Sequence, residues 1–123
     1  MKTILVVDDE SSIQFLFSRM FKKEVAASTY KLIYAENGQE ALEILDDEGC
    51  VDLIISDINM PVMDGFELLK NVKEKHVGIP VFMASAYSDE ERQVLAKELG
   101  AQKYITKPVN FPTLKEDLII FFS

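Results

Sequence analysis

Several short apolar segments of this sequence end in side chains that can do chemistry. In chain order these are Asp8, Asp9 and Glu10 after ILVV, Asp57 after LIIS, Ser85 after VFMA, and Thr106 with Lys107 after KYI. Each polar residue alone is weak evidence, because loops that follow strands are polar in general. Together, carboxylates, a hydroxyl and an ammonium are the groups of a phosphoryl-transfer site, if the fold brings them to one place.

The chemistry of this set follows from its charges. Carboxylates from adjacent strand ends repel each other unless they are protonated or neutralised. Mg²⁺ suits such an open site, because it binds oxygen ligands and keeps several waters. Lys107 then provides a point charge, and Ser85 a hydrogen bond, for an anion beside the metal. Asp57 is the natural nucleophile, since a carboxylate in this setting can form an aspartyl phosphate. The alternative is an aspartate that only caps a helix or turn.

Short apolar runs alternate with longer amphipathic ones along the chain, without a repeat or a linker. The pattern predicts strands over 3–7, 31–35, 51–56, 81–85 and 103–106. It predicts helices over 12–23, after Asn37, after Asp64, after Ser88 and from about Asn110 to Phe122. Capping-box patterns open the middle three helices at Asn37/Glu40, Asp64/Glu67 and Ser88/Glu91, and Gly49 ends the first of these.

Five strands that alternate with five helices predict an α/β fold with a parallel sheet in a single domain over 1–123. Right-handed crossovers place helices on both faces of the sheet. In such sheets ligands collect outside the carboxyl ends of the strands, at the topological switch point. If the strand order is 2-1-3-4-5, Asp57 lies beside Asp8 and Asp9 at that edge.

Composition excludes several classes of protein. A net charge of −8 over 123 residues disfavours direct nucleic-acid binding and anionic membrane surfaces. One cysteine and one histidine exclude an internal disulfide and a zinc cluster, and they fit a cytoplasmic location. Cys50 precedes an apolar run, so we expect a small buried hydrophobe. ILVV is too short for a signal peptide, and LIIFF is too short to cross a bilayer.

The motifs at the predicted strand ends resemble those of the response-regulator receiver domains of two-component and phosphorelay signalling. The resemblance rests on VVDDE (6–10), IISDINMPVMDG (54–65), FMASA (82–86) and YITKP (104–108), in matching order and spacing across nearly the whole chain. It implies a flavodoxin-like, doubly wound fold like that of the chemotaxis receivers. It also implies a phospho-accepting switch rather than an enzyme, with a sensor histidine kinase or a histidine phosphotransfer protein as the phosphodonor.

The resemblance implies a role for each residue at the predicted edge. Asp57 accepts the phosphoryl group and also binds Mg²⁺, for which Mn²⁺ can substitute. Asp9 is a direct metal ligand, Asp8 acts largely through water, and Asn59 offers its backbone carbonyl. Lys107 holds the phosphate. The competing interpretations are a solvated helix cap for the Asp8–Asp9 pair and a turn residue for Asn59.

Other positions are assigned to switching and to loop geometry. Ser85 is the switch hydroxyl, and Tyr104 is the aromatic whose rotamer follows it, unless Tyr104 is only a half-buried strand residue. The side chain of Asn59 tunes hydrolysis together with Ala86 and Tyr87.

Three further residues are assigned to structure alone. Pro61 and Gly65 shape the loop after the third strand, and Pro108 follows a cis peptide bond, with a trans bond as the alternative. Glu10 is expected to be no more than a helix N-cap.

Phosphorylation in this family shifts a population between two surfaces. The surface that changes is formed by the helix after Ser88, the strand 103–106 and the last helix. The consecutive residues 119–122, IIFF, cannot all be buried on one helix face. The end of this helix is therefore either exposed for a downstream target, a relay partner or a phosphorylation-dependent homodimer, or folded back on the core.

Three alternatives to a stand-alone receiver remain at this stage. The chain is the receiver of a longer regulator, or a Mg²⁺-dependent phosphatase of the haloacid-dehalogenase type, or a flavodoxin-like binding protein. The phosphatase lacks support, because Asn59 stands where that class has its acid/base aspartate. The flavodoxin-like protein lacks a Ser/Thr-rich phosphate loop after the first strand.

Overall fold

The computed structural model describes residues 1–48, 50–87 and 89–123. The strands are β1 (Lys2–Val7), β2 (Tyr30–Ala35), β3 (Leu53–Asp57), β4 (Val81–Ser85) and β5 (Lys103–Thr106). The helices are α1 (Ser11–Met20), α2 (Lys22–Ala26), α3 (Gly38–Glu48), α4 (Gly65–Lys75), α5 (Glu90–Glu98) and α6 (Phe111–Phe121). None of the helices within these described ranges has the length and apolar character needed to cross a bilayer.

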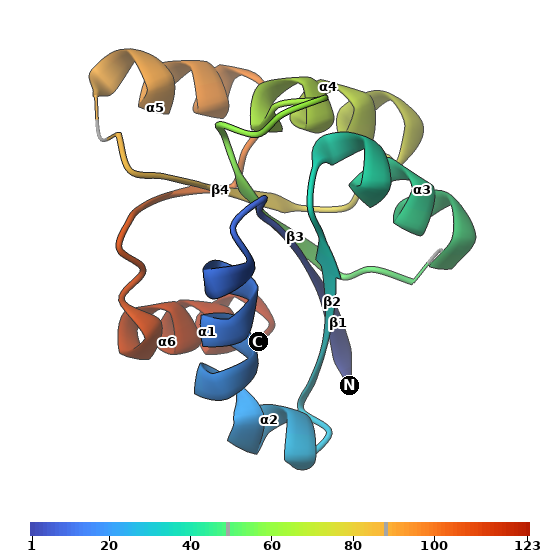
Figure 1. The fold of residues 1–123 in the computed structure, drawn as a ribbon, viewed down its shortest axis with the longest axis vertical. Coiled ribbons are helices and arrows are strands. Elements are labelled where there is room, and N and C mark those ends of the chain that lie inside the picture. The colour runs from blue at the N-terminus through green and yellow to red at the C-terminus, as the bar shows by residue number, and fades with distance from the viewer. Residues whose placement is uncertain (49, 88) are drawn as a thin grey trace.

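The five strands form one parallel sheet in the order β2-β1-β3-β4-β5, as predicted. Helices cover both faces: α3, α4 and α5 lie on one side of the sheet, and α1, α2 and α6 on the other (Figure 1). This arrangement explains the continuous apolar runs of the central strands. Every residue of β3 and β4 is buried, because neither face of the sheet is open to water.

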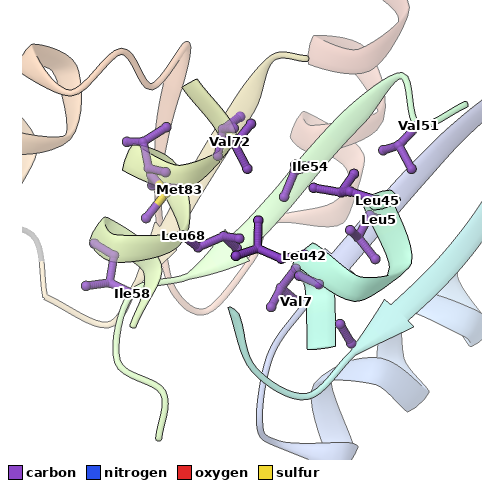
Figure 2. Packing of buried hydrophobic residues seen from close by; sticks show 14 of the residues in the cluster. Leu5, Val7, Leu42, Leu45, Val51, Ile54, Ile58, Leu68, Val72 and Met83 are labelled. Atoms are coloured by element: carbon purple, nitrogen blue, oxygen red, sulfur yellow. The ribbon is translucent and has the colours of Figure 1, made fainter. Parts of the chain in front are cut away.

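Two apolar clusters fill the two interfaces between the sheet and its helices. Under α3 and α4, Leu5 and Ile54 of the sheet pack with Leu42 and Leu68 of the helices (Figure 2). On the other face, aromatic side chains dominate the cluster, namely Phe17, Phe21, Tyr30, Phe82 and Phe111. The sheet is thereby held rigidly from both sides, which fixes the positions of its strand ends.

The predicted helix caps are present wherever the structure describes them. Asn37 Oδ1 accepts the Glu40 N–H at 2.9 Å, and Asp64 Oδ1 accepts the Glu67 N–H at 2.9 Å. Asn110 caps α6 in the same way. Gly49, predicted to end a helix, and Ser88, predicted to cap one, lie outside the described residues. The N-cap of α5 is Asp89, one residue beyond the predicted position.

The first predicted helix, 12–23, is divided, so the described residues contain six helices instead of five. The division occurs at Phe21, which separates α1 from α2. We attribute it to tertiary packing, because the buried Phe21 ring contacts Phe111 of α6 and Tyr30 of β2. The link to β2 has no glycine, and Ser28 adopts the left-handed conformation there with φ of 59°.

Cys50 is exposed, and the prediction that it is buried was wrong. It lies in the loop before β3, and the apolar run becomes buried one residue later, at Val51.

The end of α6 combines the two predicted alternatives, an exposed helix end and an end folded back on the core. Ile119 and Ile120 are exposed, and Phe121 remains 37% exposed although its ring lies 5.2 Å from that of Phe82 between centroids. Phe122 is partly buried against the aromatic cluster.

Candidate functional site

The register of the sheet brings chemically active side chains to one edge. The pairs nearest this edge are Val7–Ser56, Asp57–Ala84 and Ser85–Thr106. Because parallel strands all end at the same side of the sheet, four adjacent strands are closed by Asp8, Asp57, Ser85 and Lys107. Asp8 is level with Asp57, Ser85 lies one residue further along, and Lys107 lies two residues further along. β3 extends through Asp57 itself, so the regular ladder holds this carboxylate in place.

Lys107 bridges the two buried carboxylates of this edge. Its Nζ lies 2.7 Å from Asp8 Oδ2 and 3.4 Å from Asp57 Oδ1. Asp8 is 2% exposed and Asp57 is 7% exposed. Charges buried to this extent are tolerated only with a close opposite charge and good hydrogen bonds, and Lys107 provides both.

The acid–base properties reflect this arrangement. Burial raises the pKa of Asp57, and the neighbouring charge of Asp8 raises it further, although Lys107 and the Ile58 N–H oppose both effects. Burial lowers the pKa of Lys107, but its hydrogen bond to Asp8 and the two carboxylate charges outweigh that effect and raise the pKa overall. Lys107 therefore remains a cation, and Asp57 is more basic than an ordinary carboxylate.

Asp57 is held by its backbone as well as by its side chain. Its Oδ1 accepts the Ile58 N–H at 2.9 Å, and Ser56 Oγ donates to its carbonyl at 2.8 Å. In the described part of the chain, Oδ2 has no hydrogen-bond partner. This second oxygen is therefore available to react.

Gly65 packs directly against the backbone of Asp57. The Gly65 N–H donates to the Ile58 carbonyl at 2.7 Å. A Cβ at this position would collide with the Asp57 carbonyl oxygen and would lie 2.8 Å from Ile58 Cα. The loop between β3 and α4 can therefore close only with glycine here, which ties the position of Asp57 to the start of α4.

The acidic residues after β1 form a cluster that fits a hard cation. Carboxylate oxygens of Asp8, Asp9 and Glu10 all lie within 4.8 Å of one another. Asp8 is buried, whereas Asp9 and Glu10 are exposed, so the cluster is open to water on one side. An all-oxygen, partly open donor set of this kind is what Mg²⁺ prefers.

Sequence reasoning treated Glu10 as a helix cap only. Glu10 does occupy the N-cap position of α1, but its side chain makes no capping hydrogen bond. Its backbone N–H instead donates to Asp8 Oδ1 at 3.0 Å. The three consecutive acids were the signal in the sequence. Their carboxylates can come together because α1 begins only at Ser11, after all three residues.

The residues assigned to switching contact one another through the loop after β4. Ser85 is fully buried, and its Oγ accepts the Tyr87 N–H at 3.1 Å. The Tyr104 hydroxyl donates to the Tyr87 carbonyl. Ala86 is exposed between them. The Lys107 N–H donates to the Ser85 carbonyl at 2.8 Å, so β4 and β5 are joined at the site.

The remaining predicted residues lie around this edge. Asn59 and Pro61 are exposed in the loop between β3 and α4. Val62 follows them with φ of 69°, a left-handed conformation that is unusual for a β-branched residue. The Lys107–Pro108 peptide bond is cis, as the resemblance implies.

The fold is thus a doubly wound parallel sheet with buried acids and a lysine at its carboxyl edge, where such sheets bind their ligands. The family model described as "Response regulator receiver domain" matches residues 4–119. The chain therefore belongs to the response regulator receiver domains, as its motifs indicated. This membership also decides against the dehalogenase-type phosphatase and the flavodoxin-like binding protein.

Individual relatives agree with this assignment. The chain is 40% identical over 107 residues to the alkaline phosphatase synthesis transcriptional regulatory protein PhoP of Bacillus subtilis, covering 87% of this chain and 42% of that protein. It is 35% identical over 113 residues to sporulation initiation phosphotransferase F of B. subtilis, covering 92% and 87%. The crystal structure of Vibrio cholerae chemotaxis protein CheY4 at low pH superposes with a TM-score of 0.85 at 34% identity, covering 98% of each chain.

These relatives differ in length. The chain spans 42% of PhoP and 21% of the Escherichia coli transcriptional regulator NtrC, which is 40% identical to it over 105 residues. It spans most of phosphotransferase F and of CheY4. The similarity is thus to the receiver part of the longer regulators and to nearly the whole of the shorter proteins.

Proposed function

We propose that Asp57 accepts a phosphoryl group from a phosphohistidine of a sensor kinase or a phosphotransfer protein. The observation that carries this proposal is the placement of Asp57. It is buried, held on Oδ1 by Lys107 and the Ile58 N–H, and has Oδ2 without a partner in the described chain. In the reaction Oδ2 attacks phosphorus, the O–P bond forms and the P–N bond breaks. The electron pair returns to the imidazole nitrogen of the donor.

The chain's own residues orient this transfer. Lys107 Nζ donates to a phosphoryl oxygen, and the Ser85 hydroxyl donates to another. Asp8, Asp9 and the Asn59 carbonyl would hold Mg²⁺, with Glu10 beside them. A bound Mg²⁺ would neutralise charge on the phosphoryl oxygens. Since these groups act only on the chain's own aspartate, we describe the protein as a signalling switch and not as an enzyme with a separate substrate.

The proposed output is a change in the surface formed by α5, β5 and α6. A phosphoryl group that draws Ser85 towards it perturbs Tyr87 and Tyr104, which contact each other at this surface. A coupling of about 1–3 kcal/mol is enough to change partner affinity several-fold or more. The partner is a downstream protein, another domain of a longer regulator or a second copy of the chain, and the exchange takes place in the cytoplasm.

A relay function is the second candidate. It is favoured by the match along 87% of a protein named sporulation initiation phosphotransferase F. In this function the phosphoryl group leaves Asp57 for a histidine of a further protein. Transfer from the phosphorylated chain to candidate phosphotransfer proteins would distinguish the relay from a switch that only changes its binding partners.

The deciding experiment is intact mass spectrometry after incubation with acetyl phosphate, with and without Mg²⁺. We expect one added phosphoryl group that requires both Mg²⁺ and Asp57. Asp57→Asn tests the site, and Asp64→Asn is the matched control, because asparagine can still cap α4. An adduct that persists in Asp57→Asn would identify another nucleophile. A wild type that forms no adduct and binds no beryllofluoride would overturn the proposal.

A further inference from the structure

Gly38, the first residue of α3, packs closely against Met63 in the loop between β3 and α4. Gly38 is buried, and its N–H donates to the Met63 carbonyl at 3.3 Å. A Cβ at Gly38 would lie 2.8 Å from Met63 Cγ, 2.9 Å from its Sδ and 3.0 Å from its Cβ. A rotamer change could turn Cγ and Sδ away, but the Cβ of Met63 moves only with the backbone. The start of α3 therefore accommodates Met63 because residue 38 has no side chain.

The backbone conformation of Gly38 does not itself require glycine. Among the described residues, the glycines with positive φ are Gly78 and Gly100. Gly38 begins a helix that Asn37 caps, and alanine is normally more stable than glycine in a helix. We therefore attribute the glycine at this position to the close approach of Met63.

The segment that packs on Gly38 includes a strained turn. The Met63 N–H donates to the Pro61 carbonyl at 2.7 Å, and Val62 between them has φ of 69°. A γ-turn with positive φ is rare, and it persists only where the surrounding structure enforces it. Val62 is 80% exposed, whereas Met63 is partly buried against the apolar cluster under α3 and α4. The contacts of Met63 therefore hold the turn.

The same loop is closed at its other end on the proposed phosphoacceptor. The Gly65 N–H donates to the Ile58 carbonyl, and the Ile58 N–H donates to Asp57 Oδ1. Asn59, whose carbonyl is the proposed metal ligand, lies in the chain between Ile58 and Met63. The loop thus has two attachments, one at its closure beside Asp57 and one at the first turn of α3.

We propose that Gly38 is a positioning residue of the phosphorylation site, which lets the start of α3 hold Met63 and thereby fixes the loop that carries Asn59. The inference rests on the proposed function of Asp57, and it gives the first turn of α3 a part in metal binding. The arrangement that Gly38 permits is the one in which Asp57 Oδ1 is held and Oδ2 is available. A loop that is displaced or loosened must be ordered again when Mg²⁺ binds, which lowers the affinity.

The first test is the stability of Gly38→Ala in metal-free buffer, measured by urea denaturation. Helix propensity alone predicts a higher urea midpoint than that of the wild type, whereas the contact with Met63 predicts a lower one. Gln39→Ala is the matched control, because Gln39 is exposed in the same helical turn. In the Met63→Ala background, which lacks the colliding Cγ and Sδ, Gly38→Ala should no longer lower the midpoint.

The second test is calorimetric titration with Mg²⁺ alone. We expect Gly38→Ala to bind Mg²⁺ about tenfold more weakly, as loss of a supporting contact outside the coordination sphere does, and Gln39→Ala to bind it normally. In the Met63→Ala background, Gly38→Ala should cause no further loss of affinity. If Gly38→Ala does not fold, Met63→Ala alone tests the attachment, because it removes the side chain that α3 holds and should also weaken Mg²⁺ binding.

Three results would overturn the inference. One is a urea midpoint of Gly38→Ala above that of the wild type, and another is a Mg²⁺ affinity equal to that of Gln39→Ala. The third is a loss of equal size with and without the Met63 side chain. A wild type that accepts no phosphoryl group would instead overturn the proposed function, and the inference with it. Failure of the inference alone would appear as normal Mg²⁺ binding and Asp57-dependent phosphorylation in Gly38→Ala.

Discussion

Lys107 contacts Asp8 more closely than it contacts Asp57: its Nζ is 2.7 Å from Asp8 Oδ2 and 3.4 Å from Asp57 Oδ1. Lys107 is therefore the main counter-ion of Asp8 in this arrangement as well as a neighbour of the proposed phosphoacceptor. Two buried carboxylates share one ammonium, and the site carries net negative charge. A cation at the Asp8–Asp9–Glu10 cluster would relieve this imbalance.

Replacing Lys107 by methionine is expected to lower the free energy of unfolding by about 3 kcal/mol at neutral pH without Mg²⁺. Removal of one partner of a buried ion pair leaves uncompensated charge, which typically costs about 3–5 kcal/mol. Urea denaturation measures the loss. Mg²⁺ should raise the stability of this variant more than that of the wild type. Equal stabilisation of both proteins by Mg²⁺ would argue against a shared charge site.

Asp57→Asn is expected to stabilise the protein at pH 7 in metal-free buffer, by an amount of the order of 1 kcal/mol. Burial raises the pKa of Asp57, so the folded state binds this proton more tightly than the unfolded state does. The contribution of Asp57 to stability therefore falls as the pH rises from the ordinary value of 3.8 through the raised pKa.

The stability difference between Asp57→Asn and wild type should consequently grow with pH across that interval. Thermal unfolding at a series of pH values checks it, with Asp64→Asn as the control. A difference that is constant with pH, or that shrinks as the pH rises, would show that the carboxylate is not strained by its surroundings.

Gly65→Ala is expected to cost more than about 2 kcal/mol of stability and to slow phosphorylation. The added Cβ collides with the backbone of Asp57, and overpacking against backbone cannot be relieved by a rotamer change. Gly78→Ala is a matched control: its φ of 98° is unfavourable for alanine, but no atom lies within 4 Å of the new Cβ. That variant should lose about 1 kcal/mol and be phosphorylated normally. Similar phosphorylation rates for the two variants would contradict the proposed link between Gly65 and Asp57.

Val62→Asn is expected to raise the free energy of unfolding by about 0.5–1 kcal/mol. Val62 is 80% exposed and has φ of 69°, so it has strain without compensating burial. Asparagine adopts the left-handed conformation more readily. Val77→Asn is the control, because Val77 is 82% exposed and has no positive φ. If both substitutions have the same effect on the urea midpoint, the strain at Val62 is negligible.

Asp9→Asn is expected to weaken Mg²⁺ binding by at least about tenfold, because the proposed site makes Asp9 a direct ligand. Glu10→Gln should weaken it only a few-fold, through the lost charge, if Glu10 stays outside the first coordination sphere. Calorimetric titration with Mg²⁺ measures both. A larger loss for Glu10→Gln would exchange the roles of the two residues.

Much of the fold was predictable because its signals are local. Apolar runs, helical periodicity and caps such as Asn37 and Asp64 involve residues only a few positions apart, so they can be recognised without any tertiary information. The edge of the sheet was predictable for a related reason. In a parallel sheet the strand ends share one side, which places the residues after β1, β3, β4 and β5 together.

The features that escaped prediction depend on packing between distant elements. The break at Phe21 reflects contacts with α6 and β2, and the exposure of Cys50 depends on where β3 enters the core. The contact of the Arg92 guanidinium with the Tyr87 ring requires the first turn of α5 to face the loop after β4. None of these leaves a periodic signal in the sequence.

The sequence by itself determined the alternation of strands and helices, the order of the sheet and the identity of the residues at its carboxyl edge. Only the tertiary structure decided how those residues pair. Lys107 and Asp8 are 99 positions apart, and whether the ammonium lies nearer to Asp8 or to Asp57 depends on differences of less than 1 Å. Periodicity and capping act over a few residues, whereas such distances are set by the packing of the whole sheet between its two helical layers.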